Sequence, residues 1–188
     1  TKTVSTSGGV QTTPFEFNAD HYDENRHFFL AHYFRDNYDQ FASKLPYVQS
    51  GITINRIEVW VTNKQGKYDQ ARNIVGFMDL AESQHIYNNH WVGSGNPLPA
   101  NSANTLLSEI KSQYPNTRNI NSVSQALEGL AVYGFEGGQD YVKIESARKL
   151  NSNEYTLNST LGYISLKVAL NSDEMVAVAY EYTYAGQV

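Results

Sequence analysis

The chain has 188 residues, of which 40% are hydrophobic and 18% charged, and these proportions are typical of a folded globular protein with a sizeable core. It contains no cysteine, which excludes disulfide bonds and thiolate metal sites, and its net charge of −5 disfavours nonspecific binding to nucleic acid. No run of about 18 consecutive apolar residues is present, so the sequence predicts no transmembrane helix.

The sequence predicts a flexible N-terminal segment, or lead, followed by one folded domain. Residues 1–14 are small and polar and predict a flexible lead, whereas residues 15–188 are expected to form a single domain. The chain stops at Val188, directly after a predicted strand, and so abrupt an end suggests a piece of a longer protein.

A long N-terminal helix is predicted from Asp20 to Leu45. Asp20 is a suitable N-cap, and the acids Asp23 and Glu24 would lie in the first turn, where the helix dipole favours them. Spacings of four, four, three and four residues place one apolar stripe on the same helical face, formed by Leu30, Phe34, Tyr38, Phe41 and Leu45. Pro46 is expected to end the helix.

Strands and short helices are predicted to follow. Alternating apolar residues predict a strand over 51–63, and a change of phase predicts a bulge near Asn55 and Arg56. Residues 73–80 predict another strand, and 88–104, with two glycines and two prolines, predict a loop. Residues 104–114 and 122–130 predict two short helices.

The C-terminal part predicts more strands, over 141–150 and 155–157 and then over 161–170 and 175–184. The last two show the clearest period-2 alternation in the chain, and residues 171–173 supply a turn, which predicts an antiparallel pair. The predicted fold class is therefore α+β, with an antiparallel sheet or sandwich, a long N-terminal helix and short helical insertions.

The titratable residues give no catalytic or metal signature. His27 and His32 lie five residues apart, which misses the i, i+4 spacing of helical zinc ligands. A metal site in which His85 and His90 meet His21 or Glu82 is the alternative. Asp79 and Glu82 follow a predicted strand and are interpreted as solvated acids, although a catalytic carboxylate pair is the alternative. We therefore predict no catalytic residues, no metal and no cofactor.

Aromatic side chains are the remaining candidates for a binding surface. The sequence has 14 tyrosines and two tryptophans, and we select Trp60, Tyr87 and Trp91 as a candidate surface for a sugar or a partner protein. Trp60 lies on the strand face opposite Ile57 and Val59, so it either packs in the core or is exposed for binding.

Several segments resemble the SprA/Sov family of very large outer-membrane proteins from Bacteroidetes. The resemblance spans about residues 15–188. The segments that carry it are 32–39 (HYFRDNYD), 51–63 (GITINRIEVWVTN), 72–80 (RNIVGFMDL), 134–141 (GFEGGQDY), 162–167 (GYISLK) and 180–186 (YEYTYAG).

This resemblance implies a role in protein export. The family forms the outer-membrane translocon of the type IX secretion system and supports gliding motility in some members. It implies a non-catalytic, extra-membrane domain on the extracellular side of the outer membrane or in the periplasm. The implied partners are other domains of the full-length, membrane-embedded translocon, other secretion-system proteins or secreted cargo, and no nucleic acid. A carbohydrate- or peptide-binding β-sandwich on the cell surface is the alternative.

Overall fold

A computed structural model describes residues 23–66, 68–119 and 121–185. The predicted lead 1–14, the cap Asp20 and the candidate ligand His21 lie outside the described residues. The strands are β1 (His27–Phe29), β2 (Ile52–Val61), β3 (Arg72–Phe77), β4 (Tyr141–Lys149), β5 (Tyr155–Asn158), β6 (Tyr163–Leu166) and β7 (Val176–Tyr184). The α-helices are α1 (His32–Asp36), α2 (Tyr38–Ala42), α3 (Leu106–Gln113) and α4 (Val123–Glu128), with 3-10 helices η2 (Pro115–Arg118) and η3 (Gly129–Tyr133).

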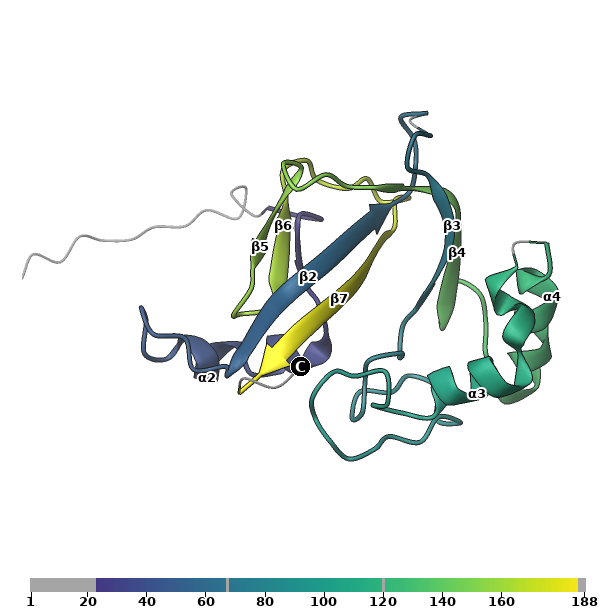
Figure 1. Cartoon of the computed structure of the whole chain (residues 1–188), viewed down its shortest axis with the longest axis horizontal. Coiled ribbons are helices and arrows are strands. Elements are labelled where there is room, and N and C mark those ends of the chain that lie inside the picture. Colours follow the sequence, from purple (N-terminus) through teal and green to yellow (C-terminus); the bar gives the residue numbers. More distant parts are fainter. Residues whose placement is uncertain (1–22, 67, 120, 186–188) are drawn as a thin grey trace, which may run out of the picture.

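Two antiparallel sheets form the body of the molecule. One has the order β3-β4-β2-β7 and the other the order β1-β6-β5, and the long β2–β7 pair crosses the centre of Figure 1. The Ile54 N–H donates to the Ser159 carbonyl at 2.8 Å and ties β2 to the end of β5. The main core between the sheets and α1 consists of Leu30, Phe34, Ile52, Ile54, Val59, Val61, Leu150, Ile164 and Leu166.

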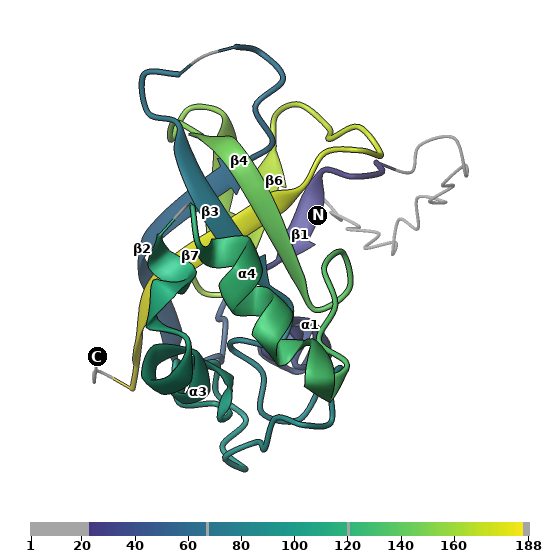
Figure 2. The ribbon, with the colours of Figure 1, turned by 90° about the vertical axis from the view of Figure 1, so that its right-hand side faces the viewer.

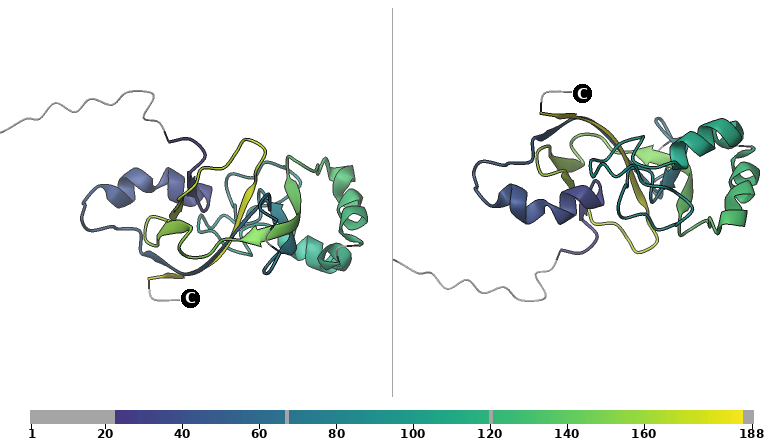
Figure 3. Two further views of the ribbon diagram at one scale, coloured as in Figure 1. Left: turned by 90° about the horizontal axis from the view of Figure 1, so that it is seen from above. Right: turned by 90° about the horizontal axis from the view of Figure 1, so that it is seen from below.

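The prediction of antiparallel sheets with short helical insertions is confirmed, whereas the predicted α+β class is not, because the fold is mainly β. None of the helices in the described ranges combines the length and the apolarity that crossing a bilayer requires. The helices are short and lie at opposite ends of the molecule, with α1 and α2 at one end and α3 and α4 at the other (Figure 3).

The predicted helix from Asp20 to Leu45 is wrong over the described residues. Residues 27–29 form strand β1, which pairs with β6, and the helical residues after them divide into α1 and α2 at Asn37. The Asn37 side chain donates to the Tyr33 carbonyl at 2.8 Å, and such a local side-chain bond competes with a continuous helix. Phe34 and Phe41, two residues of the predicted stripe, are nevertheless buried.

The predicted bulge in β2 is confirmed, because the register with β7 shifts between Ile54 and Arg56. The predicted pairing of the last two strands is wrong. Residues 163–166 form β6 in the three-stranded sheet, whereas 176–184 form β7, which pairs with β2 along its length. The connection between them passes from one sheet to the other, and Leu170 N–H donates to the Asn25 carbonyl at 2.9 Å.

Strands β3 and β4 form an arm that bends away from the central pair. β4 pairs with β2 only at Trp60 and Val61, and the arm then packs its inner face on the outer face of β2 and β7. The contact is close, because a Cβ atom added at Gly76 would lie 3.5 Å from the Ala177 Cβ. The opposite face of the arm is covered by α3, η2, α4 and η3, which we call the helical lobe (Figure 2).

The helical lobe has its own core, formed by Trp91, Leu106, Ile110, Val123, Leu127, Leu130 and Phe135. Both predicted helices are confirmed as α3 and α4, and the second continues into η3. It ends at Gly134, whose φ of 71° is left-handed and suits glycine. Residues 88–104 form the predicted loop, with a single bridge between Gly93 and Asn104.

An ion pair fixes the turn between β4 and β5. Arg148 Nη1 donates to Glu154 Oε1 at 2.7 Å and to Oε2 at 2.9 Å. Burial would raise the pKa of Glu154, but the Asn151 backbone N–H, which donates to it at 2.8 Å, and Arg148 outweigh burial and lower the pKa. A carboxyl group whose pKa is lower in the folded state stabilises the fold above its unfolded-state pKa, about 4.3. That stability is lost as the pH falls through the folded-state pKa.

We therefore expect Glu154→Gln to lower the free energy of unfolding by about 1 kcal/mol at neutral pH, where the carboxylate is charged. The difference in free energy of unfolding between the variant and the wild type should shrink as the pH falls below about 4. The wild-type carboxyl group then gains a proton and loses its charge, as the neutral glutamine lacks one throughout. Urea denaturation at neutral and at acidic pH measures both values. An equal difference at the two pH values would contradict the assigned role of Glu154.

Candidate functional site

The two tryptophans of the predicted aromatic surface are buried. Trp60 is 6% exposed and Trp91 3% exposed, whereas Tyr87 is 58% exposed. Trp60 packs on Ile144 and Ala147, and Trp91 lies in the separate core of the helical lobe. Trp60 and Trp91 therefore do not join Tyr87 in an exposed surface. Of the two outcomes that the sequence leaves open for Trp60, the structure shows core packing.

The burial of Trp60 follows from the bend of the β3–β4 arm. The arm covers the β2 face that would otherwise meet solvent, and two cations lie near the indole ring. The Arg72 guanidinium is 5.7 Å and the Lys149 ammonium 5.8 Å from the ring centre, within the range of cation–π attraction. The indole N–H donates to Glu58 at 3.3 Å. These contacts hold the Trp60 ring in its buried position between β2 and the arm.

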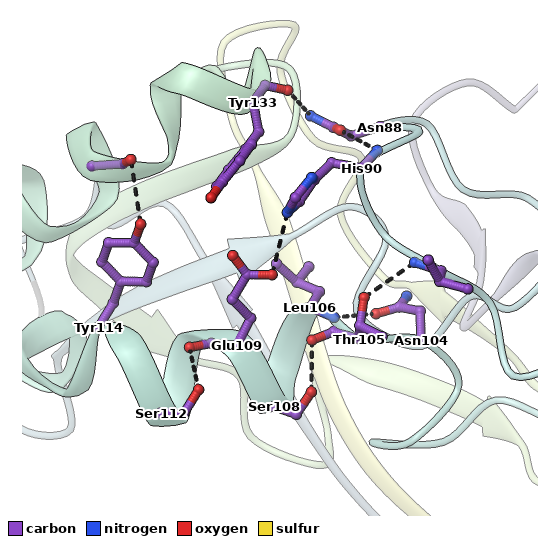
Figure 4. A network of polar contacts seen from close by, with 12 residues as sticks. Asn88, His90, Asn104, Thr105, Leu106, Ser108, Glu109, Ser112, Tyr114 and Tyr133 are labelled. Atoms are coloured by element: carbon purple, nitrogen blue, oxygen red, sulfur yellow. Dashed lines mark hydrogen bonds and ion pairs between the residues drawn. The ribbon is translucent and has the colours of Figure 1, made fainter.

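The histidines meet different carboxylates. His85 Nε2 lies 2.5 Å from Asp36 Oδ2, whereas His90 Nε2 lies 3.3 Å from Glu109 Oε2. The His90 ring also stacks on the Tyr133 ring (Figure 4), and the two ring centroids are 3.7 Å apart. Among the residues that the structure describes, no three potential ligands come together for a metal ion. The structure does not bring His85 and His90 together.

Asp79 and Glu82 are buried, so their interpretation as solvated acids is wrong. Asp79 Oδ2 accepts the backbone N–H groups of Tyr87 at 2.8 Å and of Asn88 at 3.0 Å. Glu82 Oε1 accepts the His32 N–H at 3.0 Å. Buried carboxylates that accept backbone donors organise a loop, because they satisfy N–H groups that no strand or helix pairs.

The loop between β3 and α3 is held together by side-chain amides. The Asn104 amide donates to the Asp79 carbonyl at 2.5 Å and to the Glu82 carbonyl at 2.8 Å, and its oxygen accepts the Leu106 N–H at 2.8 Å. The Asn88 amide donates to the Tyr133 carbonyl at 3.3 Å and joins the loop to η3 (Figure 4). These polar groups therefore have structural partners that hold the helical lobe against the arm.

A groove between β3 and the helical lobe is the strongest candidate site. It has a volume of about 860 Å³. Three cations and a set of apolar side chains line it, and none of the twelve described lining residues is acidic. The lining residues are Arg72, Asn73, Ile74, Val75, Phe77, Leu107, Ile110, Lys111, Pro115, Thr117, Val123 and Lys143. We call this feature the β3 groove.

The β3 groove runs along the free edge of a sheet. β3 is the outermost strand of its sheet, and Ile74 and Val75, two successive residues in regular register with β4, both line the groove, although successive side chains of a strand point to opposite faces. A groove that touches both faces of one strand must lie beside the edge of that strand. The open edge of a sheet presents backbone N–H and C=O groups that can pair with another chain.

The register identifies which backbone groups face this edge. Met78 N–H donates to the Asp140 carbonyl at 2.9 Å, which makes these residues a hydrogen-bonded pair of the β3–β4 ladder. Hydrogen-bonded and non-hydrogen-bonded pairs alternate along an antiparallel ladder, so Gly76 also bonds to β4, whereas Val75 and Phe77 do not. The backbone N–H and C=O groups of Val75 and Phe77 therefore point away from β4, toward the free edge.

Sequence reasoning missed this groove because its parts come from separate segments. Arg72, Lys111 and Lys143 belong to β3, α3 and β4, and no local pattern indicates that these residues meet. The prediction of a strand at 73–80 was the one available signal, and it says nothing about which edge of the strand stays free.

Comparison with protein-family models finds no match to this chain, and comparison with curated proteins finds none either. The SprA/Sov resemblance therefore stays a hypothesis.

Proposed function

We propose that this chain is an extra-membrane, non-catalytic domain of a type IX secretion translocon of the SprA/Sov family. The observation that carries the proposal is the resemblance of six segments distributed between residues 32 and 186. The proposed role is a contact with other parts of the translocon, with other secretion-system proteins or with secreted cargo, in protein export and, in some members, gliding motility. The proposed location is the extracellular side of the outer membrane, with the periplasm as the alternative.

The β3 groove supports a contact role. It offers an open sheet edge, apolar side chains and positive charge in one place, and these are features of protein-binding surfaces. The rival function, a sugar-binding face built on tryptophans, is less well supported, because Trp60 and Trp91 are buried and only Tyr87 of the three selected residues is exposed.

The test uses the full-length translocon in cells. We expect deletion of residues 15–188 to impair secretion of type IX cargo or assembly of the translocon. We also expect the single change Lys111→Glu to reduce secretion, because it reverses a charge in the β3 groove at an exposed position where the fold should persist. The matched control is Lys44→Glu, which makes the same charge change at an exposed position two residues after α2, and α2 lies at the opposite end of the molecule from α3 (Figure 3).

Normal cargo release by a stably expressed deletion variant would refute the translocon role. A sugar-binding module would instead leave secretion intact and lose glycan binding when Tyr87 is replaced. Accessibility of an epitope tag to antibody in intact cells distinguishes the extracellular from the periplasmic location.

A further inference from the structure

We propose that the β3 groove binds an extended peptide segment that carries both apolar and acidic side chains, and that this segment pairs with the free edge of β3 as an additional strand. The inference rests on the proposed contact role of the groove and does not depend on the translocon assignment.

The backbone of β3 favours an extended partner. Val75 and Phe77 present their N–H and C=O groups to the free edge, two residues apart, which is the spacing that a paired strand requires. Neither residue forms a backbone hydrogen bond outside the β3–β4 ladder in the described part of the chain. Adding a strand to an open edge of this kind is a recurring mode of peptide recognition.

The side chains beside the edge favour apolar residues at alternate positions of the peptide. Val75 and Phe77 point toward the helical lobe, where both pack against its core. Leu107 and Ile110 of α3 line the groove opposite them. Because side chains alternate across a strand, every second residue of the added strand would lie between β3 and α3 in apolar surroundings.

The charges favour acidic residues in the same peptide. The chain as a whole carries a net charge of −5, yet the groove contains three cations and no acid among its described lining residues. Arg72 lies over the Trp60 ring, and Lys143 also contacts Glu145, with its Nζ 3.0 Å from the carboxylate. Lys111 forms no ion pair among the described residues. Lys111 is exposed, so an acidic group of a partner can reach its ammonium group.

Binding of synthetic peptides to the 188-residue chain tests the proposal. The probe is a nine-residue peptide with blocked ends, valine at its central positions and glutamate at the two positions nearest each end, and titration calorimetry at low salt measures its affinity. Two control peptides accompany it. One carries lysine in place of glutamate, and the other has two adjacent central amides methylated, which removes one N–H donor from each edge of the strand. We expect both controls to bind at least about tenfold more weakly than the probe.

Two variants of the protein separate the contributions of backbone and charge. Val75→Pro removes an N–H group that faces the free edge, and proline is tolerated on that side of an edge strand. We expect it to weaken probe binding about tenfold, whereas Val75→Thr, its matched control, keeps the N–H group and most of the affinity. Lys111→Glu should weaken the probe at least about fivefold, and Lys44→Glu should leave it unchanged.

Hydrogen exchange of the wild-type chain supplies a measurement that needs no variant. On binding of the probe, the amides of Val75 and Phe77 should exchange more slowly, while Gly76, already bonded to β4, should change little. Unchanged exchange at Val75 and Phe77 with saturating probe would overturn the proposal. Protection of β7 amides instead would overturn it too, because β7 is the other edge of the same sheet.

Failure of this inference is distinguishable from failure of the proposed function. The probe binding as expected while cells with the Lys111→Glu translocon secrete cargo normally would support the strand-binding groove and refute its role in secretion. If the same variant impairs secretion but the probe fails to bind at millimolar concentration, the inference is overturned and the contact role stands.

Discussion

Replacing Phe34 by alanine is expected to lower the free energy of unfolding by about 3–5 kcal/mol. Phe34 is fully buried and lies in the core between α1 and the two sheets. Its ring also contacts Tyr33 and Tyr180, with centroids 5.6 Å and 6.2 Å apart. Removing it leaves a cavity among residues that belong to both sheets, and such a site is unable to collapse without moving a strand. Urea denaturation followed by circular dichroism measures the change.

The matched control for Phe34 is Tyr47→Ala. Tyr47 is also an aromatic residue near α2, but it is 77% exposed. We expect its removal to change the free energy of unfolding by no more than about 0.5 kcal/mol. A loss below about 1 kcal/mol for Phe34→Ala would show that its ring does not belong to the core of the folded protein.

The apolar stripe predicted the burial of Phe34 and Phe41 but not the structure around them. A helical period of apolar residues marks which side chains are buried, and it does not show whether the backbone between them stays helical. Residues 27–29 instead pair with β6, more than 130 residues further along the chain, as in the pairing of Phe28 with Ile164. A pairing partner at that distance leaves no trace in the local pattern.

The same limit explains the error at the C-terminus. Alternation identified β7, because its residues form the edge of a half-buried sheet and successive side chains face different surroundings. It favoured the neighbouring β6 as partner, since adjacent strands often form hairpins. The actual partner is β2, and the bulge between Ile54 and Arg56 that the sequence predicted lies within this pairing.

The candidate site was the least predictable part. Trp60 was assigned to the correct face of β2, but both faces of this strand are covered, one by the second sheet and the other by the β3–β4 arm. A period-2 pattern shows which residues share a face, and it leaves open what covers that face. The β3 groove depends on the same bend of the arm, which brings α3 beside a strand edge. No residue pattern in β3 predicts this bend.

The close approach of Gly162 to Phe34 gives the second large expected effect. Gly162 has a φ of 66°, and a Cβ atom added there would overlap the Phe34 ring. The glycine is also fixed by its backbone, since its carbonyl accepts the Leu30 N–H at 2.9 Å. We expect Gly162→Ala to lower the free energy of unfolding by about 3 kcal/mol, because overpacking and a left-handed backbone both cost energy.

A double-mutant cycle separates these two costs. With Phe34 replaced by alanine, the ring that the new methyl group would strike is gone, and only the backbone cost of Gly162→Ala, about 1 kcal/mol, is left. The two substitutions should therefore be less than additive by about 2 kcal/mol, as expected for residues in direct contact. Urea denaturation of the wild type, both single variants and the double variant gives all four values. Additivity to within about 0.5 kcal/mol would mean that the contact between Gly162 and Phe34 does not limit which residue position 162 accepts.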